Sequence, residues 1–219
     1  MHFHEGHFER LREKFDKGML EDHEVLELLL HYVIPRVNTN ERAHALIYSS
    51  GGLSHLFDRS KKSLCLVEGI GPKSADFLRV IAEIIKRYIL DTCDTTALLS
   101  DKEQLHNYLR GIYVGAYSEE GYMLMFKSNG KFLGCESIGT GTRVEGVLYV
   151  KTAVCIARDA GADTVIIAHN HPDGIDVPSD MDLETARKLD IGFGNAGMKV
   201  AEQYIVADSK CVPLSTKLK

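Results

Sequence analysis

The first part of the chain has the hydrophobic periodicity of α-helices. Over residues 6–90, apolar residues recur at three- and four-residue spacings with charged residues between them, as in HEVLELLLHYV and SADFLRVIAEIIKRYIL. Short polar or glycine-bearing segments, such as PRVNTNE and SSGG, separate these stretches. The pattern predicts an all-α domain, which we delimit as residues 1–95.

The remainder of the chain has a mixed pattern. Residues 91–100 are polar and weakly patterned and predict a linker to a second domain, residues 101–219. In GYMLMFKSNGKFLGCESIG we expect two strands joined at residues 128–131, because Asn-Gly suits the positive φ angles of a tight hairpin. Further on, the sequence predicts a helix in VKTAVCIARDAGA that ends at Gly161, a buried strand in DTVIIAH, a helix in PSDMDLETARKLDIGFGNAG and a strand in KVAEQYIVAD. The expected fold class is α+β overall, with the helical domain followed by an α/β sandwich around a mixed sheet.

Composition and charge narrow the classes of function. With 219 residues and 44% hydrophobic content, the chain has enough apolar surface for a buried core. A net charge of −5 argues against whole-molecule affinity for nucleic acid and leaves room only for a local basic patch. No apolar run is long enough to cross a membrane, and the charged N-terminus does not resemble a signal peptide, so we expect a cytoplasmic protein with no membrane partner. The five scattered cysteines lack a C-x-x-C pair, which favours reduced thiols over disulfides or a thiolate zinc site.

One glycine-bearing loop in the helical region is a candidate for phosphate binding. In LVEGIGPKSADFL, Gly69 and Gly71 permit a tight turn, and the free N–H groups at the start of the next helix could face a phosphate with Lys73 nearby. This spacing resembles the helix-hairpin-helix motif, which binds the DNA backbone without regard to sequence. An ordinary glycine-linked turn that packs two helices is the alternative, and both interpretations remain open.

The stretch AHNHPDGIDVPSDMDLETARKL contains a candidate metal site. His169 and His171 follow a buried strand, and residues i and i+2 of a strand point to the same side. Ser179 stands at the N-cap position of the following helix, whose first turn contains Asp182. Two imidazoles and one carboxylate suit Zn²⁺ and leave a fourth position open, as in catalytic sites. A polar turn between a strand and a helix would also account for these residues.

Two further residues are candidates for hydrolytic chemistry. Zinc lowers the pKa of a bound water to near neutrality, and the water then needs a proton acceptor. Glu136, in GCESIG on the second predicted hairpin strand, is the candidate base. Ser179 has two candidate roles, as a helix cap or as a hydroxyl donor to the oxyanion that forms when a carbonyl is attacked.

The complete string, H-x-H-x₇-S-x₂-D with an upstream glutamate, resembles the JAB/MPN (JAMM) metalloprotease signature. The chain as a whole resembles the RadC family, long labelled DNA repair proteins. The resemblance covers about residues 6–208, and its motifs are GIGPKSA, the Gly141-Thr142 pair before a helix, and AHNHPDG with the downstream Ser, Asp and Thr185. It implies a helix-hairpin-helix-like domain joined to a JAB/MPN-type domain, which is a cytidine deaminase-like α/β sandwich.

The resemblance also implies roles for individual residues. His169, His171 and Asp182 are similar to zinc ligands, and Ser179 is similar to the oxyanion donor. Glu136 corresponds to the general base when residues are counted back along the sequence from Gly141-Thr142, and Glu145 is a nearby alternative for the same role.

The chain departs from the family pattern at three places outside the ligand set. Asp173 stands where relatives carry serine, and Lys151 stands where they carry arginine after a proline. Glu202 and Gln203 replace an Asp-His pair, which puts any role of that pair in supporting the metal site in doubt.

The leading hypothesis for the function is a zinc-dependent hydrolase of the JAMM type that cleaves a peptide, isopeptide or related amide bond in a protein or peptide substrate. The alternative is a DNA-associated protein of repair or mobile-element biology. In that case Gly69, Gly71 and Lys73 would contact DNA weakly, and the JAB domain would act on a partner or on nucleic acid. A scaffold with a decayed site is the third hypothesis, and the complete ligand set argues against it.

Overall fold

The computed structural model describes residues 5–35, 37–140, 147–208 and 210–214. The chain forms two compact units, Met1–Ile84 and Ile85–Lys219. The division falls within one long helix, α6 (Pro72–Thr92), whereas the sequence places the linker at residues 91–100. The domain limits of 1–95 and 101–219 therefore stay a prediction.

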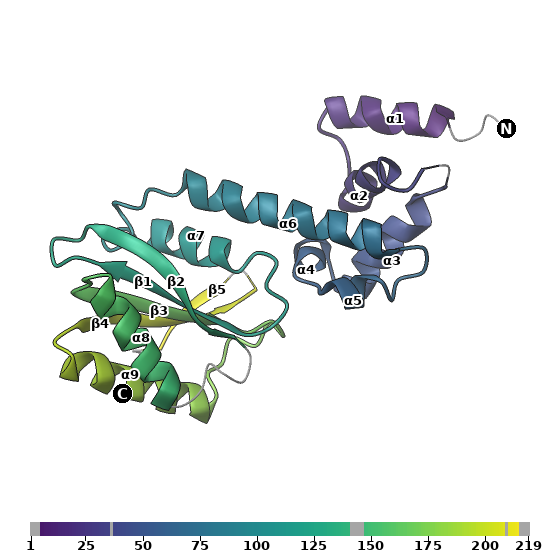
Figure 1. The fold of residues 1–219 in the computed structure, drawn as a ribbon. Helices are drawn as coiled ribbons and strands as arrows, with labels where there is room; N and C mark the ends of the chain where they lie inside the picture. The colour runs from purple at the N-terminus through teal and green to yellow at the C-terminus, as the bar shows by residue number, and fades with distance from the viewer. Residues whose placement is uncertain (1–4, 36, 141–146, 209, 215–219) are drawn as a thin grey trace. The chain divides into compact units, whose positions relative to one another are not determined.

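The first unit is helical, as the periodicity predicts (Figure 1). Its helices before α6 are α1 (Glu5–Asp16), α2 (Asp22–His31), α3 (Asn40–Ser50), α4 (Leu53–Phe57) and α5 (Lys61–Leu64). The apolar faces of α2, α3, α4 and α5 and of the first turns of α6 meet in one core, which includes Leu30, Leu46, Leu56 and Leu78, each at most 1% exposed. Most of the stability of such short helices comes from this packing, because isolated helices of about 10 to 12 residues are marginal in water.

The second unit contains a five-stranded mixed sheet, which confirms the α+β fold class. Its elements after α6 are α7 (Lys102–Ile112), β1 (Glu120–Phe126), β2 (Phe132–Thr140), α8 (Val147–Asp159), β3 (Thr164–Asn170), α9 (Asp180–Asn195), β4 (Lys199–Ala207) and β5 (Lys210–Pro213). The strand order is β2-β1-β3-β4-β5, and β3 and β4 form the parallel pair, joined by the crossover through α9. The edge strand β5 was not predicted from the sequence; it has four residues and contains a proline.

The hairpin of β1 and β2 forms where the Asn-Gly pair predicts it. Gly130 has a φ of +85°, and the Lys127 N–H donates to the Lys131 carbonyl at 2.9 Å. A positive φ is inexpensive for glycine, so this residue closes the turn and sets the register of the two strands.

Each face of the sheet is covered by helices (Figure 1). On one face, Leu124, Phe126 and Ile166 pack with residues of α7 in a first apolar core. On the other face, Met123 and Ile167 pack with residues of α8 and α9 in a second core. Because side chains alternate along a strand, His169, two positions after Ile167, faces the side of the sheet that α8 and α9 cover.

The described helices include none that is both long enough and apolar enough to span a bilayer. All five cysteines are free thiols, as their spacing predicts.

Candidate metal centre

The two histidines lie where β3 ends. His169 is the sixth residue of β3 and shares the face of Val165 and Ile167, and His171 follows the last strand residue. The backbone of His171 is still held by the sheet, because its N–H donates to the Val206 carbonyl of β4 at 2.9 Å. Both imidazoles are therefore presented from backbone that is hydrogen-bonded to a neighbouring strand.

The carboxylate comes from the first turn of α9. Ser179 is the N-cap of this helix, with an extended backbone (φ −74°, ψ 164°), and its hydroxyl oxygen accepts from the Asp182 N–H at 3.1 Å. In return, the Ser179 N–H donates to Asp182 Oδ2 at 2.7 Å. This reciprocal capping box starts the helix and turns the Asp182 carboxylate back toward the strand end.

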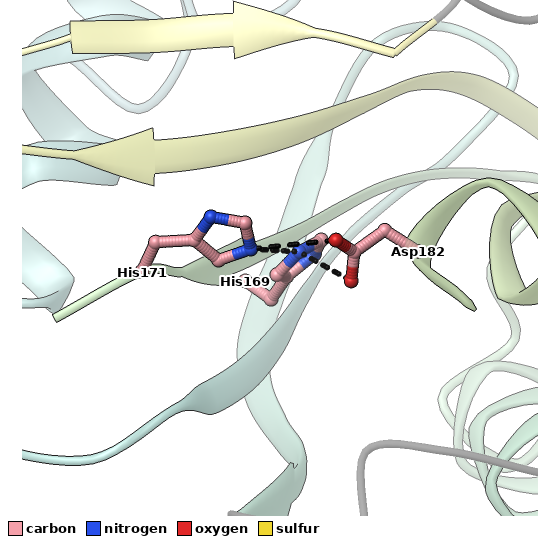
Figure 2. A group of neighbouring side chains, drawn as sticks. All are labelled: His169, His171 and Asp182. Atoms are coloured by element: carbon pink, nitrogen blue, oxygen red, sulfur yellow. Dashed lines mark hydrogen bonds and ion pairs between the residues drawn. The ribbon is translucent and has the colours of Figure 1, made fainter. Parts of the chain in front are cut away.

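The three predicted ligands converge on one point, as Figure 2 shows. The distances are 3.2 Å from His169 Nε2 to His171 Nε2, 3.2 Å from His169 Nε2 to Asp182 Oδ1, and 3.5 Å from His171 Nε2 to Asp182 Oδ2. Ligand atoms at the corners of a tetrahedron about 2.0–2.1 Å from a zinc ion would be about 3.3–3.4 Å apart. The donor set and its spacing therefore fit a tetrahedral zinc ion with one open corner.

Hydrogen bonds favour the arrangement that a cation requires. His171 Nδ1 lies 2.7 Å from the Ile175 carbonyl oxygen, which can only accept. Nδ1 therefore carries the hydrogen, and the Nε2 of a neutral His171 presents its lone pair to the centre. In the metal-free site the pKa of His171 is raised above its usual value, chiefly because of its hydrogen bond with Asp182. Burial opposes ionisation of Asp182, but hydrogen bonds from His169, His171 and Ser179 outweigh it and lower the pKa of this carboxyl far below its usual value.

Three other acidic residues of the loop and of α9 have partners away from the histidines. Asp173 Oδ1 accepts from the Ile175 N–H at 3.2 Å, and Asp176 pairs with Lys210 at 2.7 Å. Glu184 pairs with Lys188 on the outer surface of α9 at 2.6 Å. Of the acids in this stretch, Asp182 is the one that faces the histidines.

Glu136 lies on the same face of the sheet as the candidate metal ligands, but on a different strand. It is exposed on β2 and opposes Met123 of β1, which opposes Ile167 of β3. Directly opposed residues of antiparallel strands share a face, so Glu136 and His169 face the same side with β1 between their strands. Strand spacing and rise place their Cα atoms about 12 Å apart. Its role as the base stays a prediction, and the competitor Glu145 lies outside the described residues, as do Gly141 and Thr142.

The hydroxyl hydrogen of Ser179 is engaged at the site. Ser179 Oγ donates to Asp182 Oδ2 at 2.7 Å while it accepts from the Asp182 N–H. Because a hydroxyl has one hydrogen, Ser179 would have to give up its bond to the candidate ligand before it could donate to a substrate. Its role as an oxyanion donor stays a prediction, whereas its role as a helix cap is confirmed.

Two buried amide side chains hold the elements of the site in place. Asn170, between the two histidines, accepts from the Glu120 N–H at 2.7 Å and donates to the Ser118 carbonyl at 3.2 Å, which ties the entry of β1 to the end of β3. Gln203 of β4 donates to the Ala186 carbonyl and to Asp190 Oδ1, both at 2.9 Å. Ala186 lies one turn beyond Asp182, so Gln203 anchors the helix that carries the candidate ligand. Gln203 thus has a structural role in this chain.

In the helical unit, the glycine loop has a conformation that requires one of its two glycines. Gly69 has a φ of +77°, Ile70 is buried, and α6 begins with Pro72 at its first position. A Cβ at Gly69 would clash with Arg42 Nε, so the guanidinium packs directly against the glycine. Lys73 is exposed in the first turn of α6. Arg42 is a second cation at this loop, and its presence there could not be predicted from the sequence because it lies far earlier in the chain.

Comparisons with known proteins agree with the geometry. The profile of the RadC-like JAB domain family matches residues 99–218, which include every candidate residue of the metal centre. A UPF0758 protein of Fusobacterium nucleatum is 29% identical, over 92% of this chain and 91% of the relative. UPF0758 proteins of Vibrio campbellii (27% identical, 90% of this chain and 88% of the relative) and Pseudoalteromonas translucida (29% identical, 95% and 93%) are similar over comparable spans. The chain belongs to the RadC-like JAB domain family.

Proposed function

We propose that the chain is a zinc-dependent hydrolase that cleaves an amide bond in a peptide, isopeptide or related substrate. The observation that carries the proposal is the spacing of two imidazole nitrogens and one carboxylate, which matches three corners of a zinc tetrahedron. Three protein ligands with an open fourth corner are typical of catalytic rather than structural zinc sites. A zinc ion held there would polarise a carbonyl and acidify water.

The remaining steps of the proposed reaction belong to the protein side chains. Glu136, exposed and on the same face of the sheet as the ligands, is the proposed base that takes a proton from the attacking water. The same carboxyl then gives that proton to the leaving nitrogen, which separates as an amine. Asp182 and the two histidines keep their positions through the capping box at Ser179 and the bond to the Ile175 carbonyl.

Metal analysis of the purified chain tests the first part of this proposal. We expect about one zinc per chain, a loss of zinc in His169→Ala, and full retention in His44→Ala, which removes an exposed histidine of the helical unit. A wild-type protein that takes up no zinc would overturn the proposal.

Activity measurements test the second part. A panel of peptide and isopeptide substrates should be cleaved by the zinc-loaded wild type and not by Glu136→Gln, which should retain its zinc. Unchanged activity in Glu136→Gln would remove this residue from the role of base. Phosphodiester substrates in the same screen test the alternative that the JAB domain acts on nucleic acid.

For the helical unit we propose weak, sequence-independent contact with a DNA backbone as a second function. The observation that favours it is the loop at Gly69, where the Arg42 guanidinium packs against the glycine three residues before α6, whose first turn contains the exposed Lys73. Backbone N–H groups at a helix start and two cations can bind phosphate, and such binding weakens steeply with salt. Duplex DNA of unrelated sequences should bind with equal affinity, and Lys73→Glu should weaken binding and reduce the salt dependence. Salt-independent or absent binding by the wild type would exclude this function.

A further inference from the structure

Three large apolar side chains are exposed beside the candidate metal centre. Ile175 and Val177 lie in the loop between β3 and α9, and Met181 lies in the first turn of α9. Their exposed fractions are 55%, 64% and 49%, respectively. Single exposed apolar residues are common on protein surfaces, whereas a group of them marks a binding surface. These three fall within one stretch of seven residues, so they form a local group rather than scattered positions.

The chain connects each of these side chains closely to a candidate zinc ligand. The Ile175 carbonyl oxygen lies 2.7 Å from Nδ1 of His171. Val177 is two residues before Ser179, whose hydroxyl and N–H both donate to the Asp182 carboxylate at 2.7 Å. The third apolar side chain belongs to the residue directly before Asp182. With Cα atoms 3.8 Å apart along the chain, all three side chains begin within roughly 10 Å of a ligand atom.

The loop between β3 and α9 is held in a fixed shape. The Gly174 N–H donates to the His171 carbonyl at 3.0 Å, and Asp176 pairs with Lys210 of β5 at 2.7 Å. Gly174 has a φ of +77°, and a Cβ there would lie 2.9 Å from both carboxylate oxygens of Asp208, so the loop packs closely on the end of β4. A loop that is already ordered loses little conformational freedom when a ligand binds, which favours binding to the side chains that it exposes.

The charges next to these side chains favour a polypeptide as the ligand. Asp173 and Asp180 are exposed within the same stretch of chain, and the ammonium group of Lys210 is engaged with Asp176. Exposed carboxylates repel the phosphates of nucleic acid and of anionic lipid headgroups. An apolar side chain of a polypeptide meets no such repulsion.

We propose that Ile175, Val177 and Met181 form an apolar subsite that binds a large apolar side chain next to the scissile amide of a polypeptide substrate. The inference rests on the proposed function, since it names the substrate class of that reaction. A substrate side chain on this surface would remove apolar area of both partners from water while its amide lies at the candidate metal centre. Because the surface is open rather than a closed pocket, we expect a preference of about tenfold for a large apolar group, at the lower end of the range for apolar recognition.

Two pairs of hydroxamates, which bind zinc through the hydroxamate group, test this preference without requiring catalysis. N-acetyl-leucine hydroxamate is compared with N-acetyl-glycine hydroxamate, and isobutylsuccinic monohydroxamate with succinic monohydroxamate. The isobutyl group thereby lies on the acyl side of the scissile bond in the first pair and on the amine side in the second. Each compound is titrated into the zinc-loaded, full-length protein. The wild type should bind the isobutyl compound of at least one pair about tenfold more tightly than its partner.

The variant Val177→Thr/Met181→Gln tests the subsite, because it replaces two apolar side chains with polar ones of similar size. Ile175 is left unchanged because its carbonyl bonds to His171. The matched control is Ile191→Thr, which changes a 63% exposed residue of α9 about 13 Å along the helix from the ligand turn. The isobutyl preference should fall to about twofold or less in the double variant and stay at about tenfold in the control, with equal zinc content in all three proteins.

Several results would overturn the inference. These are a wild type without an isobutyl preference in either pair, a double variant that keeps the preference, and a double variant that loses its zinc. Val177→Thr alone is measured in parallel as the smaller change, and an unaltered preference there counts equally against the subsite. Adsorption of the wild type to vesicles of phosphatidylcholine and phosphatidylglycerol, if it is lost in the double variant, would assign the surface to a membrane instead.

The experiment separates this inference from the proposed function. A wild type that shows the isobutyl preference, and loses it in the double variant, but cleaves no amide would contradict the proposed function and leave the subsite intact. A wild type that cleaves amides without such a preference would overturn the subsite alone.

Discussion

Ser179 and Asp182 hold each other through three hydrogen bonds across one turn of α9. The Ser179 hydroxyl and its N–H both donate to Asp182 Oδ2 at 2.7 Å, and the Asp182 N–H donates to Ser179 Oγ at 3.1 Å. The same contacts that begin the helix therefore also orient the carboxylate toward the histidines. Helix capping and ligand orientation cannot be separated at this position.

Ser179→Ala should consequently weaken both stability and zinc binding. Loss of an N-cap hydroxyl lowers the free energy of unfolding by about 1 kcal/mol, and loss of a bond that orients a metal ligand lowers metal affinity by about 10-fold or more. Urea unfolding of the zinc-free protein and calorimetric zinc titration measure the two effects. Ser179→Thr retains the hydroxyl and should keep most of the wild-type stability and zinc affinity. A Ser179→Ala protein with wild-type zinc affinity would show that the cap does not orient the Asp182 carboxylate.

Zinc binding should weaken as the pH falls through neutrality. The hydrogen bond with Asp182 raises the pKa of His171 in the metal-free site, so a proton occupies that imidazole at a higher pH than in a free histidine. Below this pKa, zinc must displace the proton, and apparent affinity should fall by up to about tenfold for each pH unit. In the zinc-free protein the raised pKa stabilises the fold at low pH, and this contribution is lost as the pH rises through the folded-state pKa.

Zinc titrations between about pH 6 and pH 8 in buffers of different ionisation enthalpy count the protons released. Asp182→Asn removes the interaction that raises the pKa of His171, so the pKa of this imidazole in the zinc-free variant, measured by NMR, should be lower than in the wild type. A zinc affinity that is independent of pH over this range would contradict the protonation state inferred for His171.

Gln203 should support the metal centre through α9 rather than by contact with the ion or substrate. Gln203→Met keeps the volume of this 5% exposed side chain but removes the donor to Ala186 and Asp190. We expect a loss of about 1 kcal/mol in the free energy of unfolding and a smaller loss of zinc affinity. Gln203→Ala should cost more, because it also leaves a cavity. Unchanged stability in both variants would show that the amide does not anchor the helix.

The candidate ligand set could be predicted from the sequence because its geometry is local. His169 and His171 are two residues apart at the end of one strand, and Ser179 and Asp182 form a capping pattern with fixed helical geometry. Strand alternation and helix capping are short-range rules, so the convergence of these residues required only that the loop over residues 172–178 turn back. The Asn-Gly hairpin was predictable for the same reason.

The buried residues that pack around the candidate site could not be predicted from the sequence, because they come from distant parts of the chain. The Tyr149 hydroxyl packs over β1 only because Gly121 has no side chain there, and neither residue has a distinctive local pattern. Similarly, Gln203 meets α9 only through the parallel pairing of β4 with β3. The edge strand β5 lacks enough alternating residues to be detected before its pairing with β4 is known.

The two glycines of the loop before α6 should respond differently to alanine. Gly69 has a φ of +77° and Arg42 against it, whereas Gly71 has an ordinary φ and nothing within 4 Å of a built Cβ. Gly69→Ala should therefore lower the free energy of unfolding by about 1–2 kcal/mol, since a left-handed backbone is costly for a residue with a Cβ. Gly71→Ala should leave stability within about 1 kcal/mol of the wild type or raise it slightly. Equal losses at both positions, measured by urea unfolding, would contradict the turn geometry.

A double-mutant cycle between Gly121 and Tyr149 tests their contact directly. Gly121→Ala places a methyl group 2.8 Å from Tyr149 Oη and 3.4 Å from Ile138 Cγ1, and such overpacking costs about 1–3 kcal/mol of stability. Tyr149→Phe removes the oxygen at the closer contact, so the double variant should recover part of the loss caused by Gly121→Ala. The interaction energy from urea unfolding of the four proteins should be at least about 0.5 kcal/mol, as expected for residues in contact. Strict additivity of the two changes would mean that the hydroxyl does not lie over Gly121.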